Sequence, residues 1–325
     1  MSWTCLVTGA TGFVGSHLAE HLVARGYQVL CLIRKESNLR WLRHLPVEYV
    51  RGDVETADLR EVVRRVDYVY HAAGLTRALD PRQYYEVNAE GCRRMLEVCR
   101  EAPRLRRFLL VSSLAAVGPC REGKTLTEDA PPNPITPYGR SKLAAEEIAA
   151  QFMASVPVTV VRPPTIYGPR DENSLLLFRL VRRGVRPRFL ARAEHSVVHV
   201  ADLVEGAIRA AESVVAAGRT YFIADPRSYQ LNELVDAVVE ALGVRAREVP
   251  ISPTVLRLGA RLAELGARAV GAPTIFDRYK VEEMLQERWV CDVSRAREEL
   301  GFEAGVSLAV GVRETARWYY EAGWL

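Results

Sequence analysis

The sequence predicts an α/β protein with a doubly wound parallel sheet and a smaller C-terminal lobe. Three observations lead to this prediction. Short runs of branched apolar residues alternate with amphipathic segments in the first half of the chain. A glycine-rich turn separates the first of these runs from the first helix. After about residue 163 the alternation stops, and loops rich in proline and arginine separate further helices. Strands that alternate with helices imply crossover connections, and therefore a parallel sheet that binds ligands at the carboxyl ends of its strands.

The first strand is the apolar run Cys5–Val7, and the first helix carries Val14, Leu18 and Leu22 on one face. The next five predicted strands lie at 27–33, 47–51, 66–71, 107–111 and 156–161. Helices are expected at 56–65, 81–101, 137–154, 174–184, 201–213, 230–242 and 253–270, and loops at 163–173 and 184–195. We assign residues 1–162 to the first domain and 163–325 mostly to the lobe. Residues 196–225 are expected to return and pack on the first domain.

The composition is that of a soluble globular protein, with 325 residues, 49% apolar and 26% charged. A net charge of +4 is too small for a dedicated nucleic-acid binder. The six cysteines form no C-x-x-C pair, so neither a zinc or other metal site nor a disulfide framework is expected. Met1 leads almost directly into the first strand and no run of 18 apolar residues occurs, so we expect no signal peptide, no membrane span and a cytoplasmic setting.

The glycine-rich turn runs from Thr8 to Gly15 and lies between a strand and a helix, which is the context of a dinucleotide-binding loop. Glycines there permit a tight turn and a close approach of the backbone to a pyrophosphate, which the helix N-terminus then holds. The spacing is G-x-x-G-x-x-G rather than G-x-G-x-x-G, and a plain turn is the alternative interpretation. The residues expected to contact a cofactor here are Gly9, Thr11, Gly12, Phe13, Val14 and Gly15.

Three further strand ends carry candidate cofactor residues. Arg34 occupies the place where an NAD-specific site usually carries an acid, and an arginine can pair with a 2′-phosphate, so NADP is favoured and NAD stays possible. Asp53, beside Val54, is expected to accept from the adenine amino group, or else to act as a turn residue. Small residues after the fourth strand would let the cofactor approach the backbone; they are Ala72, Ala73 and Gly74. The neighbouring His71 is expected to be structural.

Tyr138 and Lys142 are four positions apart on a predicted helix and so share a face. A neighbouring cation stabilises a phenolate, so we expect the pKa of Tyr138 to be lowered toward the range of a general acid/base, with an oxidised nicotinamide contributing. Ser112 and Ser113 end the fifth strand at the same edge of the sheet, where a hydroxyl would hold the substrate oxygen. Two serines after a strand are also common turn residues.

With these features the chain resembles the extended short-chain dehydrogenase/reductase family, also called the NAD-dependent epimerase/dehydratase family. The motifs that carry the resemblance are T-G-A-T-G-F-V-G at 8–15, G-D-V at 52–54, H-A-A-G at 71–74, V-N-A-E-G at 87–91, S-S-L-A-A-V-G at 112–118, Y-G-R-S-K at 138–142, R-P-P-T-I-Y-G-P-R-D at 162–171, and W-V-C-D-V-S-R-A followed by E-L-G-F at 289–302.

The resemblance implies a Rossmann-type sheet and a nicotinamide cofactor. It makes Ser113 the catalytic hydroxyl and Tyr138 the acid/base, with Lys142 also binding the nicotinamide ribose. It places Asn88 in a helix motif that supports the site and Pro163 near the nicotinamide. It also implies a homodimer built from the helices at 81–101 and 137–154, although their apolar residues would serve equally as core; these are Met95, Val98, Ala145, Ile148 and Phe152.

The substrate remains open at this stage. Thr165 stands where sugar-nucleotide enzymes of the family usually carry asparagine, and Leu114 and Ala115 stand where dehydratases usually carry acids. With Arg34, these residues favour a reductase like the dihydroflavonol-reductase and 3β-hydroxysteroid-dehydrogenase branch, acting on a lipophilic or phenolic alcohol or ketone. Apolar residues in 251–275 would line its pocket, or form an ordinary amphipathic helix pair.

A nucleotide-sugar epimerase with bound NAD is the second hypothesis, because several arginines could hold a diphosphate; they are Arg179, Arg182, Arg183, Arg186, Arg188 and Arg192. A non-catalytic cofactor-sensing scaffold is the third hypothesis. Such relatives typically lose the tyrosine or the lysine, whereas Ser113, Tyr138 and Lys142 are all present here.

Overall fold

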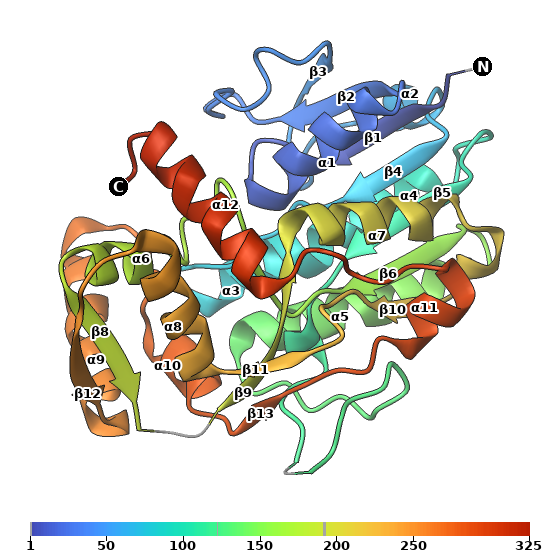
Figure 1. Ribbon diagram of the computed structural model, residues 1–325. Helices are drawn as coiled ribbons and strands as arrows, with labels where there is room; N and C mark the ends of the chain where they lie inside the picture. The colour runs from blue at the N-terminus through green and yellow to red at the C-terminus, as the bar shows by residue number, and fades with distance from the viewer. Residues whose placement is uncertain (1, 122, 191–192) are drawn as a thin grey trace.

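A seven-stranded sheet runs through the computed structural model, which describes residues 2–121, 123–190 and 193–325 (Figure 1). Neighbouring strands are all parallel, in the order β10-β6-β5-β4-β1-β2-β3. The strands are β1 (Thr4–Thr8), β2 (Gln28–Ile33), β3 (Glu48–Arg51), β4 (Tyr68–His71), β5 (Arg107–Val111), β6 (Val158–Arg162) and β10 (Thr220–Phe222). The predicted doubly wound α/β fold is confirmed. The chain changes direction across the sheet between β1 and β4, and their carboxyl ends flank the crevice where such sheets bind ligands.

Helices cover both faces of this sheet (Figure 1). One face carries α1 (Phe13–Ala24) and α7 (Val200–Glu212), whose buried Leu18, Leu22 and Leu203 share a core with β1 and β2. The other face carries α2 (Arg60–Val63), α4 (Gly91–Cys99) and α5 (Pro137–Phe152). Each fully buried leucine stabilises the folded protein by about 2 kcal/mol, because its apolar surface is removed from water. The cores on the two faces of the sheet therefore hold α1 and α5 against the strand ends.

The helix predicted at 81–101 consists of three segments. They are α3 (Pro81–Tyr84), the π-helical turn η1 (Tyr85–Glu90) and α4. Asp80 caps the start by accepting from the backbone N–H of Arg82. A π turn rotates the residues that follow it, and such turns occur frequently at functional sites. Here the turn buries Asn88 against the sheet edge.

The two loops predicted in the second half of the chain contain strands. The four-stranded mixed sheet consists of β7 (Thr165–Tyr167), β9 (Glu194–His199), β11 (Ser228–Gln230) and β13 (Arg288–Trp289). A separate parallel pair consists of β8 (Val185–Phe189) and β12 (Arg247–Ile251). The prediction of loops at 163–173 and 184–195 was wrong because these strands are short and partly exposed, with Arg and Pro interrupting any apolar alternation. Their pairing with distant segments defines them.

Helices complete the second half of the chain. The longer elements are α6 (Leu175–Arg182), α8 (Leu231–Leu242), α9 (Pro253–Val270), α10 (Arg278–Met284), α11 (Ser294–Leu300) and α12 (Leu308–Glu321), and two 3-10 turns are η2 (Leu114–Ala116) and η3 (Val214–Ala216). Figure 1 shows β8, β12 and α9 together at one side of the molecule. The buried Leu256 and Ala260 of α9 pack with Val281 of α10. The strand β10 belongs to the central sheet, so residues from both halves of the chain build it.

Candidate active site

The turn after β1 is tightly closed around its glycines. Gly9 has φ +68°, and a Cβ on it would lie 2.7 Å from the backbone of Ala72 and Ala73. A Cβ on Gly15 would lie 2.1 Å from the Gly9 carbonyl oxygen. Only glycine therefore permits this approach of β1, β4 and α1.

The N-terminus of α1 offers free backbone donors. Gly12 is the N-cap residue, is exposed, and supplies no side chain to accept from the first turn. No acid lies in that first turn. Uncapped N–H groups at a helix N-terminus bind anions. The predicted contacts Thr11, Phe13 and Val14 lie beside it and are partly exposed, so the turn fits a cofactor pyrophosphate.

Hydrogen bonds join the carboxyl ends of β1 and β4. The Thr8 hydroxyl lies 2.9 Å from His71 Nδ1 and accepts from the Ala73 N–H at 3.1 Å. Burial, with the charge of Lys142, lowers the pKa of His71 to about 3, so this ring stays neutral. The structural interpretation of His71 agrees with these contacts, which hold Ala72 and Ala73 beside the glycine turn.

Asn88 braces the site from the π-helical turn η1. Its Oδ1 accepts from the Leu75 N–H at 2.7 Å, and its Nδ2 donates to the Leu75 carbonyl at 3.1 Å and to the Ser141 hydroxyl at 2.9 Å. Asn88 is buried, and a Cβ on Gly74 would lie 3.0 Å from its Oδ1 and 3.7 Å from Lys142 Nζ. These contacts fix the loop after β4 against α5, so Asn88 acts on the site through other residues.

Arg34 and Asp53 lie close together at the ends of β2 and β3. Arg34 is exposed, and its backbone N–H donates to the Ser37 hydroxyl at 3.0 Å. Asp53 Oδ1 accepts from the N–H groups of Glu55 and Thr56 and from the Thr56 hydroxyl. Burial alone would raise the pKa of Asp53, but these hydrogen bonds and the charge of Arg34 hold it below its usual value. Asp53 therefore does stabilise a turn, and Val54 beside it is buried.

The two serines after β5 have different surroundings. Ser112 is buried and donates to Glu146, which also forms a buried ion pair with Arg162 at 2.6 Å. Ser113 is partly exposed, and its hydroxyl accepts from the Ala115 N–H at 3.1 Å at the start of η2. Buried Pro163 lies beside them, its carbonyl accepting from Leu114. Ser113 alone of the pair is free to face a substrate.

Tyr138 lies in the first turn of α5, and Ser113 is near enough to lower the pKa of its hydroxyl. The pKa of Tyr138 is raised to about 12, mainly by burial, with the charge of Glu283 and the neighbouring Tyr84 contributing and the nearby Ser113 hydroxyl opposing them. The expectation of a lowered pKa is therefore wrong for the chain by itself. The physical reason is desolvation of the phenolate, which is the largest cause of the shift.

Lys142 is buried one turn further along α5. Its ammonium donates to the Val111 carbonyl at 2.7 Å, at the end of β5. Burial lowers the pKa of Lys142 to about 8, although the nearby Cys92 and Glu146 oppose that shift. The lysine therefore carries its charge near neutral pH, beside Gly74 and the end of β5.

The lobe brings acids to this site that the sequence analysis did not identify. Glu283 of α10 accepts from the Thr136 hydroxyl at 3.0 Å, and that hydroxyl also caps α5 by accepting from Gly139. Asp277 directly precedes α10. Burial is the main reason that the pKa of Tyr84 is raised to about 12, and the charges of Asp277 and Glu283 contribute to this shift. The Tyr84 ring lies 6.1 Å from that of Tyr138. No local pattern marks these residues, because only the packing of the lobe brings them to α5.

Most of the arginines considered for a diphosphate have other contacts. Arg186 pairs with Asp236 and Glu248, and Arg188 also lies near Asp236. Arg179 donates to the Trp324 carbonyl, and Arg182 lies over the Tyr320 ring. Arg192 falls outside the described residues.

Most of the large apolar residues of α9 are exposed to solvent. Leu256 is buried, whereas five others on α9 are exposed; they are Val255, Leu258, Leu262, Leu265 and Val270. The helix α9 is therefore amphipathic, as the second interpretation expects, and these five side chains are exposed to solvent.

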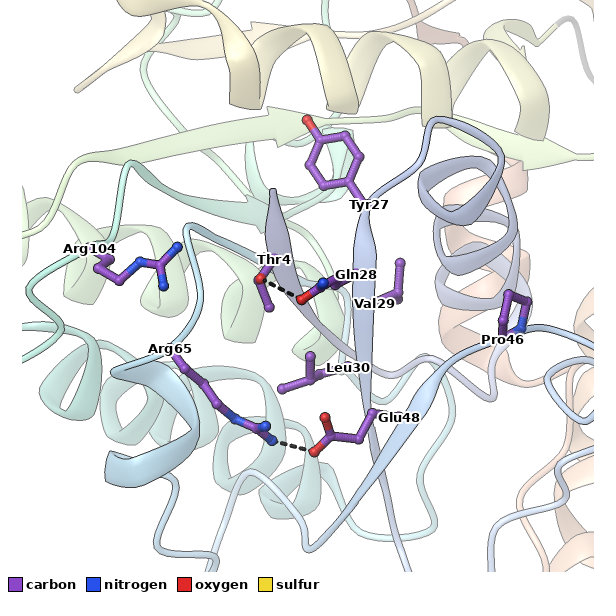
Figure 2. A pocket seen from close by; sticks show the side chains of 9 residues that line it. All are labelled: Thr4, Tyr27, Gln28, Val29, Leu30, Pro46, Glu48, Arg65 and Arg104. Atoms are coloured by element: carbon purple, nitrogen blue, oxygen red, sulfur yellow. Dashed lines mark hydrogen bonds and ion pairs between the residues drawn. The ribbon is translucent and has the colours of Figure 1, made fainter. Parts of the chain in front are cut away.

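A hollow of about 430 Å³ opens at the opposite, amino-terminal edge of the sheet. Figure 2 shows it at the starts of β1 and β2, where Thr4 hydrogen-bonds Gln28 and Arg65 pairs with Glu48. None of the predicted site residues lines it. Parallel sheets bind ligands at the other edge, so the candidate active site is the cluster around Ser113 and Tyr138.

Two absences apply to the part of the chain that the structure describes. Its His, Cys, Asp and Glu side chains form no group of three or more suited to holding a metal ion. None of its helices combines the length and the apolar character needed to cross a bilayer.

Known proteins resemble the chain over most of its length. The model of the NAD dependent epimerase/dehydratase family matches residues 5–224. The ceramide reductase of Caulobacter vibrioides is 32% identical over 98% of this chain and 95% of that protein. A 4-hydroxy-2-methyl-3-oxo-4-farnesyl-3,4-dihydroquinoline-1-oxide ketoreductase of Stigmatella aurantiaca is 30% identical over 94% of this chain and 93% of that protein. The structure of MoeE5 in complex with UDP-glucuronic acid and NAD has a TM-score of 0.77 and 25% identity, covering 99% of this chain and 100% of that one.

Proposed function

Because the chain belongs to the NAD-dependent epimerase/dehydratase family, we propose that it is an NADP-dependent reductase or dehydrogenase acting on a lipophilic ketone or secondary alcohol. The observation that carries the proposal is the placement of Tyr138 near Ser113 at the carboxyl edge of the sheet, with buried Lys142 one turn further along α5 and bonded to the Val111 carbonyl. This arrangement also argues against a non-catalytic scaffold.

The glycine turn, the loop at Ala72–Gly74 and Pro163 would hold the cofactor, and Lys142 would hold its nicotinamide ribose. When bound, the nicotinamide supplies or accepts the hydride. In reduction, Ser113 positions the carbonyl oxygen by a hydrogen bond. Tyr138 then donates its proton to that oxygen as negative charge develops there. A pKa of about 12 keeps Tyr138 protonated, as a proton donor must be. The charge of Lys142 stabilises the tyrosinate that results.

An uncharged substrate agrees with the electrostatics on the lobe side. Glu283 and Asp277 lie beside the tyrosines, and their negative charge would oppose a diphosphate. The ion pairs of Arg186 also leave it less available to bind one. The relatives named for a ceramide and for a farnesylated quinoline act on lipophilic substrates, which supports the same class here.

A nucleotide-sugar epimerase is the second candidate, favoured by the similarity to MoeE5 with its UDP-glucuronic acid and NAD. The two activities differ in how they use the cofactor. An epimerase retains NAD through its cycle, whereas a reductase releases NADP after each turnover. Cofactor identified in the purified protein by mass spectrometry separates them. Retained NAD, together with interconversion of UDP-sugars, would contradict the reductase proposal.

The preference for NADP rests on Arg34, which is exposed at the end of β2 near Asp53. An arginine–phosphate pair adds charge-assisted hydrogen bonds. The Arg34→Ala variant should bind NADPH at least about tenfold more weakly, with NADH binding nearly unchanged, by fluorescence titration. Arg43→Ala, an exposed arginine in the following loop, is the matched control. Tenfold tighter binding of NADH than of NADPH by the wild type would refute the preference.

The acid/base assignment is tested by Tyr138→Phe, which removes the hydroxyl and keeps the ring. Turnover of a lipophilic ketone should fall by a factor of about a thousand or more, with NADPH affinity unchanged. Tyr84→Phe, in the ring beside it, is the matched control. Full activity of Tyr138→Phe would show that another group moves the proton.

The homodimer also remains a proposal. Met95, Ala145 and Ile148 are buried in the core of this chain, which leaves the partly exposed Val98 and Phe152 to contact a second copy. These two residues border a hollow of about 480 Å³ that residues 54–60 and α4 line, with Phe152 of α5 at its edge. Light scattering of Val98→Glu should report a monomer if this face is the interface.

We further propose a cytoplasmic setting, consistent with the reduced cysteines.

A further inference from the structure

The helix α9 presents a row of large apolar side chains to solvent. Val255, Leu258, Leu262 and Leu265 are 53%, 57%, 62% and 63% exposed. Their spacing of three and four places them along one side of the helix. Leu190 extends the row, because it is 61% exposed and its N–H bonds to the Ile251 carbonyl just before α9. We call these five residues the α9 row. Contiguous apolar surface of this kind marks an interaction site.

Arginines line one flank of this row. Arg257, Arg261 and Arg268 are all exposed and lie on neighbouring positions of the helix surface, between the α9 row and the buried face. Arg257 pairs with Glu282. Arg261 and Arg268 form no ion pair within the described residues. The acid of the helix itself, Glu264, is mostly buried and is bonded to Arg278. The exposed side of α9 is therefore apolar along its centre and positive along one edge.

We propose that α9 docks on the surface of a bilayer that contains anionic phospholipid, with the α9 row in the interface and the arginines among the headgroups. An amphipathic helix with apolar residues on one side and arginines beside them binds in this way without crossing the membrane. Eighteen residues give a helix about 27 Å long that can lie flat on the surface. Charge complementarity favours anionic lipid as the occupant.

A second copy of the chain fits this surface less well. A two-fold axis that pairs two α9 helices in antiparallel fashion brings both arginine rows to the same side, where they repel. No exposed acid on α9 offsets that repulsion, since Glu264 is turned inward. The lipid headgroup supplies the negative charge that a second copy lacks.

The position of α9 connects the proposed docking surface to the candidate active site. Its buried face packs on α10, and Glu283 of α10 bonds Thr136 at the start of the helix that carries Tyr138. A docked enzyme would therefore hold its substrate lobe at the membrane, where a lipophilic ketone is dissolved. The docking itself rests on the exposed surface alone and stands apart from the proposed reaction.

Vesicle flotation of the full-length protein tests the proposal without any substrate. Wild-type protein should float with vesicles of phosphatidylcholine containing about 30% phosphatidylglycerol, and at least about tenfold less with phosphatidylcholine alone. Leu258→Glu/Leu262→Glu should reduce binding to the anionic vesicles about tenfold or more. Arg261→Glu/Arg268→Glu should remove the preference for anionic lipid.

The matched control is Val214→Glu/Val215→Glu, which makes the same change at two exposed valines of η3. It should float like the wild type. Unchanged melting temperature and NADPH binding in every variant exclude unfolding, because all the changed side chains are exposed. The proposal is overturned if the wild type does not float, or if Leu258→Glu/Leu262→Glu floats equally well. A dimer that dissociates in this variant while no vesicle binding occurs would assign the α9 row to self-association instead.

Discussion

Replacing Lys142 by methionine should stabilise the folded protein while removing its activity. Burial lowers the pKa of Lys142 from 10.5 to about 8. The pKa therefore differs by about 2.5 between the unfolded and the folded chain. A pKa difference of one corresponds to about 1.36 kcal/mol, so holding the charged lysine in the fold costs about 3 kcal/mol. Methionine removes this cost but also the hydrogen bond to the Val111 carbonyl, worth about 1–2 kcal/mol. The net expectation is a stabilisation of about 1–2 kcal/mol near neutral pH.

The pH dependence gives this prediction its specific signature. Below pH about 8 both the folded and the unfolded chain carry a protonated Lys142, so the full cost is present. Between about 8 and 10.5 the unfolded chain binds the proton and the folded chain does not, so the wild type gains stability as the pH rises. The advantage of Lys142→Met should therefore shrink as the pH rises, vanish within that window and become a disadvantage of about 1–2 kcal/mol above it.

Urea denaturation of both proteins without cofactor, at several pH values from neutral to about 10, measures this difference. Lys35→Met, at an exposed position, is the matched control and should change little at any pH. A Lys142→Met variant that is less stable than the wild type near neutral pH would refute the reasoning. A stability difference that does not vary with pH would refute it too. Either result would mean that the ammonium is better solvated in the fold than its burial implies.

Four other predictions follow from the same geometry. Ser112→Ala, which removes a buried donor to Glu146, should cost about 2 kcal/mol in urea denaturation and leave turnover nearly intact. Ser113→Ala should do the reverse, lowering kcat about a hundredfold with little loss of stability. Gly15→Ala should destabilise the fold by about 3 kcal/mol, since its Cβ would lie 2.1 Å from a backbone oxygen, and circular-dichroism melting measures this. The rate of ketone reduction, followed by NADPH absorbance, should fall as the pH rises through about 8, because Lys142 loses its charge there; a flat profile to pH about 10 would contradict that role.

Local patterns were sufficient for the elements of the central sheet. Branched apolar runs predicted the strands from β1 to β6, and β5 agrees residue for residue with the prediction at 107–111. The helix α9 agrees equally well with the prediction at 253–270, because Ser252 caps its start and Gly271 its end. The strand β8 of the lobe was not predicted, because its partner β12 lies about 60 residues away and no local alternation of apolar residues defines it.

The sequence by itself determined where the glycine turn, Ser113, Tyr138 and Lys142 lie, because parallel strands bring their carboxyl ends to one edge. Tertiary structure decided the pKa values and the hydrogen-bond partners of the side chains at this edge. Burial raised the pKa of Tyr138 where spacing had suggested the opposite, and the hydrogen bond to Glu146 separated Ser112 from Ser113. Desolvation and long-range contacts depend on segments far apart in the chain. No pattern within a few residues of Tyr138 encodes them, and packing alone brings Glu283 to it.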